Sequence, residues 1–232
     1  MNDYPYNLGP EVSLSQRVTQ VMKRVYVKMF LALLVSTVAA WITSHSAMVV
    51  YMIEHRWVYW GLFIVEIGLV LGLSSGISRM KSSTAAALFY LFAIINGMAL
   101  SMIFLVYTGD SIFKTFLITA GVFGAMSVYG YTTARDLTQF GTFLRMALFG
   151  LVICIVINIF WANSTLEWLI SIAGVLIFIG LTAWDTQKIK QMAQVMPSSG
   201  YGHLATLGAL SLYLDFINLF IYLLRFFGNS RD

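Results

Sequence analysis

Seven long hydrophobic runs follow one another along the chain, separated by short polar connections. Each is about as long as the roughly 20 apolar residues that an α-helix needs to cross a bilayer. The runs cover residues 25–46, 57–77, 84–107, 111–132, 143–162, 166–187 and 204–227. Because the connections are short, consecutive helices should be antiparallel neighbours in one bundle. The pattern predicts an all-α, polytopic membrane protein with one transmembrane domain of seven helices, over residues 25–232.

A polar stretch of 24 residues precedes the first run and contains Pro5 and Pro10. It lacks the apolar core and the small-residue cleavage site of a signal peptide. We therefore expect a polar cytoplasmic tail over residues 1–24 and a first span that acts as its own insertion signal.

The last hydrophobic run carries a stripe of polar residues. Their spacings of 4, 3, 4 and 3 place them on one face of a helix, while Leu, Ile and Phe cover the rest. The stripe consists of Ser211, Asp215, Asn218, Tyr222 and Arg225. An ionisable side chain at the centre of a membrane helix costs about 2.5 to 3.5 kcal/mol on insertion scales. The stripe is therefore expected to face protein or water, and Asp215 becomes a candidate functional residue.

Composition supports the membrane assignment. Hydrophobic residues make up 59% of the chain and charged residues 10%, and the mean hydropathy is +0.81. Soluble domains have about 45 to 50% apolar and 25% charged residues. The net charge of +4 comes from scattered Lys and Arg residues that form no basic block, which argues against a nucleic-acid partner. The single Cys154 excludes an intrachain disulfide and a cysteine-rich metal site.

Basic residues predict the orientation. With a cytoplasmic N-terminus, ten of the 14 Lys and Arg residues lie on the cytoplasmic side, which is a clear positive-inside bias. The ten are Arg17, Lys23, Arg24, Lys28, Arg79, Lys81, Arg135, Arg145, Lys188 and Lys190. Seven spans then place the C-terminus outside, unless the final segment is re-entrant and returns to the cytoplasm.

Asp185, near the end of the sixth run, is a second carboxylate in apolar surroundings. If the sixth helix continues toward Gln194, Asp185 lies about 12 to 14 Å from that helix end, and Asp215 lies about 16 Å into the returning helix. The two carboxylates can therefore meet. In a low-dielectric site both cannot ionise cheaply, so the pair should share a proton and respond to pH. When ionised, they offer the hard oxygen ligands that suit Ca²⁺.

Structural interpretations of these residues stay open. Asp185 has Lys188 three residues further on and is a candidate for an interfacial ion pair. Asp215 is a candidate for structural hydrogen bonding to Asn218 or Tyr222. Glu66, in the second run, either adds a carboxylate to a pathway or is a protonated donor between helices.

Two further polar positions, Asn96 and Arg79, are also informative. Asn96, with Gly97 and Ser101, favours helix packing. Arg79 either extends to the headgroups or reaches Asp185 from the same side of the membrane. Glu66, Ser211, Asn218 and Tyr222 are the candidate pathway-lining residues.

The sequence argues against an enzyme. The three histidines, His45, His55 and His203, all fall at span ends or in loops, so no intramembrane Ser-His pair or histidine metal cluster is expected. The Gly72–Gly76 segment is explained by helix packing, because a nucleophile motif needs a preceding strand. No lysine follows Lys190, which excludes a retinal Schiff base in the last helix. No bound cofactor is expected.

Three segments resemble the Bax inhibitor-1 family, also called the transmembrane Bax inhibitor motif family, and particularly its bacterial members. The long segment 211–228 is the most specific. The segment from Trp184 to Lys190 resembles the family's Tyr-Asp-Thr-Gln-like stretch, with Trp184 where tyrosine is commoner, and the segment from Phe92 to Ser101 resembles its third-helix motif. The resemblance covers about residues 15–228.

This resemblance implies a seven-helix fold with the last helix in the middle of the other six. It also implies a pH-dependent Ca²⁺ leak, in which a di-aspartyl pair between helices six and seven acts as pH sensor. The matching positions are Asp185 and Asp215, and Arg79 is the match for an arginine that holds the pair in the closed state.

The leading hypothesis is therefore a pH-sensitive calcium leak channel, a multi-pass protein of the plasma (inner) membrane that passes Ca²⁺ down its gradient. In it, Asp185 and Asp215 sense pH and contact Ca²⁺ transiently, with Ca²⁺ and H⁺ as transported or regulatory ions. A membrane interaction protein that modulates a membrane protease or a cell-death regulator is one alternative. A proton-coupled calcium exchanger is the other.

Overall fold

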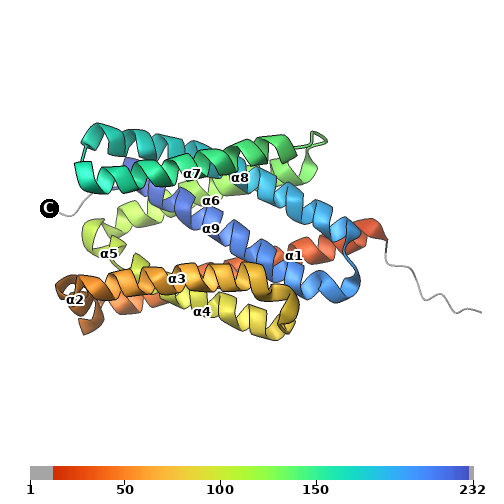
Figure 1. Ribbon diagram of the computed structural model, residues 1–232, viewed down its shortest axis with the longest axis horizontal. Coiled ribbons are helices and arrows are strands. Elements are labelled where there is room, and N and C mark those ends of the chain that lie inside the picture. Colours follow the sequence, from red (N-terminus) through yellow and green to blue (C-terminus); the bar gives the residue numbers. More distant parts are fainter. Residues whose placement is uncertain (1–12, 230–232) are drawn as a thin grey trace, which may run out of the picture.

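The computed structural model describes residues 13–229, which are mainly helical (Figure 1). Seven helical segments of the described chain are long and apolar enough to cross a membrane, which confirms the predicted seven-span, all-α architecture. The elements are α1 (Leu14–Ser44), α2 (Ala47–Glu54), α3 (Arg56–Gly76), η1 (Ile77–Arg79), α4 (Ser82–Leu100), α5 (Ile103–Val106), α6 (Gly109–Thr132), α7 (Thr138–Trp161), α8 (Ser164–Val195), η2 (Ser198–Gly200) and α9 (Tyr201–Phe227).

Helices α1 and α8 extend furthest beyond the hydrophobic runs that predicted them. Helix α1 begins at Leu14, inside the expected polar tail, because Ser13 and Gln16 form a reciprocal capping box at its start. Residues 1–12 of the expected tail lie outside the described residues. Helix α8 continues to Val195, past the hydrophobic run that ends at residue 187, which is the continuation toward Gln194 on which the meeting of the two aspartates was argued. A hydrophobic run indicates only the part of a helix that lies inside the bilayer. The helix can continue into the polar region until capping residues end it.

Helix α9 is the centre of the bundle. It packs against α1, α4, α6 and α8 and runs diagonally between the other helices in Figure 1. In its most apolar 18-residue window 72% of the residues are buried, against 6% for α3 at the periphery. The expectation that the last helix lies in the middle is confirmed.

Two glycines allow unusually close helix contacts. A Cβ atom at Gly97 of α4 would overlap the backbone of Ser36 in α1, and one at Gly130 of α6 would overlap the backbone of Ala183 in α8. Small residues at such crossings let membrane helices approach closely enough for dispersion contacts to hold them together. Gly97 therefore has the packing role expected from the sequence.

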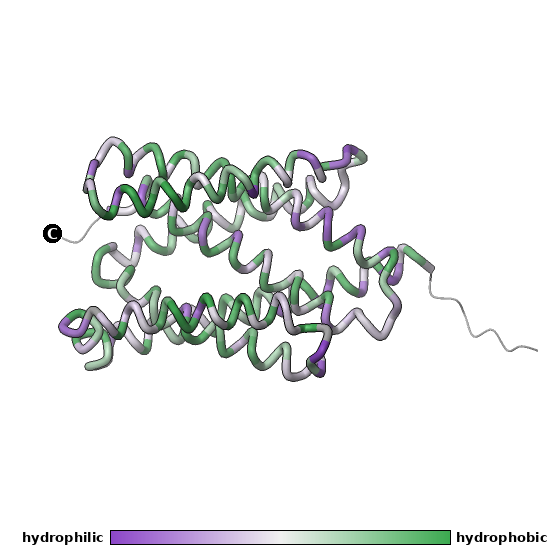
Figure 2. Tube along the Cα trace, viewed as in Figure 1, coloured by the Kyte–Doolittle hydropathy of each residue, from purple (hydrophilic) through white to green (hydrophobic). Residues whose placement is uncertain are grey.

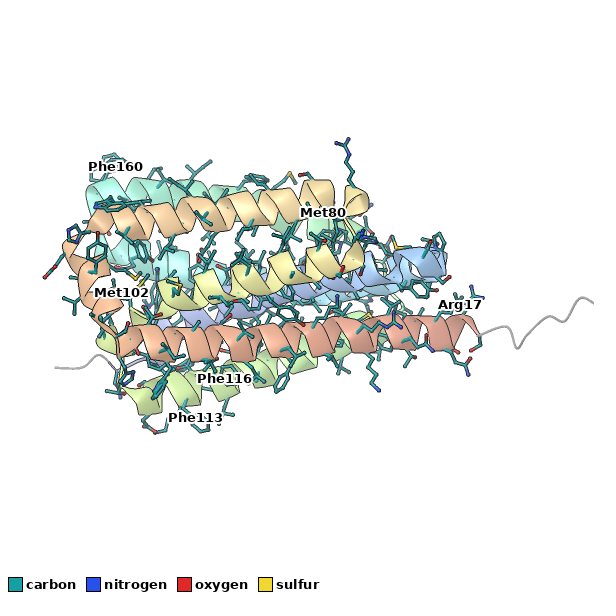
Figure 3. All side chains as sticks on the ribbon, turned by 90° about the horizontal axis from the view of Figure 1, so that it is seen from below. Arg17, Met80, Met102, Phe113, Phe116 and Phe160 are labelled. Atoms are coloured by element: carbon teal, nitrogen blue, oxygen red, sulfur yellow. The ribbon has the colours of Figure 1, made fainter. Side chains whose placement is uncertain are left out.

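The outer surface and the two ends of the bundle differ in polarity. Large apolar side chains project outward along the helices, among them Phe113 and Phe160, which are 62% and 84% exposed (Figure 3). Hydrophilic residues gather toward the helix ends (Figure 2). The alternating directions of the spans bring the start of α1, η1 and the α6–α7 and α8–α9 connections to one end, which carries the ten basic residues named above. We call it the basic end.

Candidate functional site

The contact between α8 and α9 forms the candidate site. Along α9, three residues spaced by seven face α8: Gly208 lies against Ile189, Asp215 contacts Asp185, and Tyr222 stacks on Phe178. The residue numbers of these contacts rise along α9 while they fall along α8, as expected for antiparallel helices packed along a heptad seam. The aspartates therefore occupy the middle of the most extensive helix contact in the described chain.

The carboxyl groups of Asp185 and Asp215 are in hydrogen-bonding contact. Asp215 is 4% exposed, whereas Asp185 is partly exposed. No donor within the described residues reaches Oδ2 of Asp215. Two ionised carboxylates have no proton to donate, so their contact becomes a hydrogen bond only when one of them is protonated. The geometry thus brings together the two acids that the sequence singled out.

Two cationic side chains lie near the carboxyl pair, on the side of Asp185. Arg145 from α7 and Lys188 from α8 lie over the indole ring of Trp184, at 4.7 and 4.9 Å from its centroid. Both also attract the neighbouring Asp185 carboxylate electrostatically. Their side chains are exposed, so each attraction is screened by solvent. The positive charge therefore favours Asp185 as the ionised member of the pair.

Trp184 is fixed in place by Gly141 of α7. A Cβ atom at Gly141 would overlap the indole ring, so only glycine leaves room for this contact. The ring is buried, and it separates α7 from the helix that carries Asp185. Trp184 thus sets where the two cations lie relative to the carboxyl pair.

Ser211, Asn218 and Tyr222 of the stripe also face protein, as expected, but they have different partners, whereas Arg225 at the end of the stripe is exposed. Tyr222 is buried against Phe178, and Asn218 donates to the backbone oxygen of Leu214 in its own helix at 2.8 Å. Ser211 is half-buried. Their role in lining a pathway remains a prediction.

Arg79 lies apart from the carboxyl pair. It ends η1 at the basic end, its side chain is exposed, and within residues 13–229 it has no hydrogen-bond or ion-pair partner. The cations that act on Asp185 here are instead Arg145 and Lys188. In this conformation Arg79 therefore does not hold the pair. The sequence analysis did not predict the contact between Arg145 and Trp184. This contact joins α7 and α8, and hydropathy does not specify how one helix is rotated relative to the other.

Glu66 belongs to a second polar cluster, on another side of α9. Its Oε1 accepts from Nδ2 of Asn96 at 3.3 Å, and Oδ1 of Asn96 accepts from the hydroxyl of Tyr213 at 2.8 Å. Tyr213 is fully buried and also pairs with the hydroxyl of Ser36 at 2.6 Å. This chain of contacts connects α3, α4, α9 and α1. Tyr213 lies outside the stripe, so the spacing pattern gave no signal for it.

The carboxyl pair has too few ligands for a closed calcium site. Ca²⁺ takes six to eight oxygen ligands in proteins. Within the described residues, no three His, Cys, Asp or Glu side chains gather closely enough to hold a metal. Two carboxylates supply at most four oxygens, so the pair by itself does not complete the coordination shell of a calcium ion.

Comparison with known proteins places the chain in a family. The model of the family described as "Inhibitor of apoptosis-promoting Bax1" matches residues 18–232. The chain belongs to the Bax inhibitor-1 family. This confirms the resemblance found in the three segments above, and it extends over nearly the whole chain.

Bacterial relatives agree with this assignment. The inner membrane protein YbhL of Escherichia coli K12 is 45% identical over 214 residues, which is 90% of this chain and 92% of the relative. An uncharacterized protein of Rickettsia prowazekii is 44% identical over 222 residues, 95% of this chain and 94% of the relative. An uncharacterized membrane protein of Streptococcus pyogenes is 35% identical over 230 residues, covering 99% of this chain and all of the relative. The protein is thus a multi-pass membrane member of the Bax inhibitor-1 family.

Proposed function

We propose that this protein is a calcium leak channel whose open fraction is set by protonation of the pair formed by Asp185 and Asp215. The observation that supports the proposal is the contact of these two carboxyl groups in the middle of the α8–α9 seam. Ionisable groups inside a membrane are costly, and where they persist they commonly mark ion or proton pathways.

The pair holds one proton at neutral pH in this mechanism. Asp215 keeps it, because Asp215 is the more buried group and a buried charge is the more costly one. Asp185 stays ionised, since Arg145 and Lys188 attract it. The protonated Asp215 then donates a charge-assisted hydrogen bond to Asp185, and such bonds are stronger than those between neutral groups. This bond holds α8 and α9 together in the closed state.

Acidification weakens this closed state. When Asp185 takes up a second proton, the hydrogen bond loses its charge assistance and the attraction to the two cations disappears. The α8–α9 seam is then free to separate. The stabilisation is therefore present above the pH at which Asp185 protonates and is lost as the pH falls through it. The Ca²⁺ leak is expected to rise with acidification.

Calcium flux measurements test the proposal. Purified protein is reconstituted into vesicles loaded with a Ca²⁺ dye, and the initial flux is recorded from pH 5 to pH 8. Wild type should leak more at acidic pH, whereas the double variant Asp185→Asn with Asp215→Asn should show no pH response. The exposed Asp110 at the other end of the bundle gives a matched control, Asp110→Asn, which should behave as wild type. Wild-type flux no higher than that of protein-free vesicles would refute the leak.

The same vesicles distinguish a leak from a proton-coupled exchanger. In an exchanger, Ca²⁺ movement is driven by the proton gradient, so a protonophore that removes the gradient slows it. A leak responds only to the local pH at the pair. Flux that persists with protonophore at equal pH on both sides supports the leak.

A further inference from the structure

A groove between α1 and α6 lies on the outer surface of the bundle near the basic end. It has a volume of about 470 Å³. Its walls are Thr19, Met22, Lys23 and Tyr26 from α1, and Gly124, Ser127, Val128 and Tyr131 from α6. Both helices pack against α8 and α9. The groove takes no part in the proposed leak mechanism, because the groups named there as acting on the carboxyl pair, Arg145 and Lys188, do not line it.

The groove lies at the level of the membrane boundary. Lys28 is the last charged residue of α1, and the helix is hydrophobic from Met29 onward. On the other wall, Tyr131 lies in the last turn of α6. Tyrosines such as Tyr26 and Tyr131 are enriched where helices leave the hydrocarbon and enter the headgroup layer. A lipid in the groove would therefore have its headgroup beside Lys23 and an acyl chain running toward the bilayer centre.

The charge around the groove is positive. Helix α1 carries four basic residues and no acidic one. The single acidic residue of α6, Asp110, is in its first turn, at the opposite end of the helix. Lys190 adds a further cation behind the α6 wall, where it donates to the backbone oxygen of Tyr131 at 2.7 Å and lies over its ring. The electrostatic complement of this surface is an anion.

Ser127 offers a buried polar atom without a partner. Its side chain lines the groove and is only 6% exposed, and its hydroxyl has no hydrogen-bond partner among the described residues. A buried hydroxyl without a partner costs free energy, so such a group commonly marks a missing ligand or water. The hydroxyl oxygen itself is enclosed, so the Ser127 side chain has to rotate toward the groove before an ester or phosphate oxygen of a lipid headgroup can accept from it.

We infer that this groove binds an anionic glycerophospholipid of the surrounding bilayer. The phosphate lies at Lys23, the Ser127 side chain rotates to donate to a headgroup oxygen, and one acyl chain runs past Tyr26 and Gly124 toward the bilayer centre. Basic pockets between membrane helices bind acidic lipid headgroups in this way. The two tyrosines enclose the glycerol region.

Lipid titration tests the inference. The full chain in detergent is titrated with dioleoyl phosphatidylglycerol, dioleoyl phosphatidylcholine or glycerol 3-phosphate, and bound lipid is counted by native mass spectrometry. We expect one tightly retained phosphatidylglycerol, weaker retention of phosphatidylcholine and no retention of glycerol 3-phosphate. Lys23→Gln should weaken phosphatidylglycerol binding about fivefold, which corresponds to about 1 kcal/mol for one basic residue near a membrane surface. The exposed Lys114, paired with Asp110, provides the control Lys114→Gln, which should change nothing.

A second variant fills the groove without touching its charge. A Cβ atom at Gly124 meets nothing within 4 Å, so Gly124→Leu places its side chain in the groove and should abolish retention. Gly150 of α7 has the same free space away from the groove, and Gly150→Leu should retain the lipid. Equal retention of the two lipids, or wild-type retention by Gly124→Leu, would overturn the inference. Retention of glycerol 3-phosphate alone would reassign the groove to a soluble phosphate.

Discussion

Replacing Asp185 with asparagine should produce a channel that leaks at neutral pH as wild type leaks in acid. The amide has nearly the shape of the acid but never carries a charge, so it imitates the protonated state of Asp185. Its carbonyl oxygen still accepts the hydrogen bond from Asp215, but the bond loses its charge assistance and the attraction to Arg145 and Lys188 is lost. The closed seam should be weakened while its packing stays the same.

The size of the effect follows from these contacts. A hydrogen bond to a charged group contributes about 1.5 to 3 kcal/mol, and one between neutral groups about 0.5 to 1.5 kcal/mol. Losing the charge therefore costs about 1 to 1.5 kcal/mol. The two cations are exposed, so together they add only about 0.5 to 1 kcal/mol. The total of about 1.5 to 2.5 kcal/mol multiplies the ratio of open to closed channels by roughly ten to seventy.

The matched variant Asp215→Asn separates the roles of the two acids. Asparagine at 215 is a permanent donor, as the protonated Asp215 is at neutral pH, so this variant should keep a near wild-type leak and its response to acid. The assay is the initial Ca²⁺ flux into dye-loaded vesicles at pH 7 and pH 5.5, normalised to reconstituted protein. The reasoning is refuted if Asp185→Asn still responds to pH, or if Asp215→Asn alone removes the response.

Three further outcomes are expected. Arg145→Gln should raise the leak at pH 7 by about 1.5- to 2-fold, whereas Arg79→Gln should not, since Arg145 acts on the pair and Arg79 does not; equal effects in the flux assay would contradict this. Tyr213→Phe removes two buried hydrogen bonds and should lower the stability by about 1 to 3 kcal/mol, seen as a lower melting midpoint in detergent. Gly141→Ala forces a Cβ atom into the indole ring packed on it and should destabilise by about 1 to 3 kcal/mol, whereas Gly150→Ala, with open space around it, should melt no lower than wild type.

Local patterns were enough for the architecture and for the two acids. Seven hydrophobic runs gave seven spans, because the cost of placing polar groups in hydrocarbon acts on each segment separately. The 4-3-4-3 spacing in the last run predicted a helix with one polar face, and that face packs against protein from Ser211 to Tyr222, while Arg225 at its end is exposed. The prediction that Asp215 needs a partner followed from the free-energy cost of an ionisable side chain inside a membrane.

Contacts between helices were decided by the tertiary structure. Asp185 meets Asp215 because α8 and α9 pack along one seam in one register, and the rotation of α7 decides that Arg145, rather than Arg79, acts on the pair. The hydrogen bond from Tyr213 to Asn96 also depends on how two helices pack. It connects α9 with α4, whose bonded residues are more than a hundred positions apart in the chain. Hydropathy and periodicity describe each helix alone. The partners of each polar group depend on how side-chain volumes interlock between helices, which exists only once the bundle is assembled.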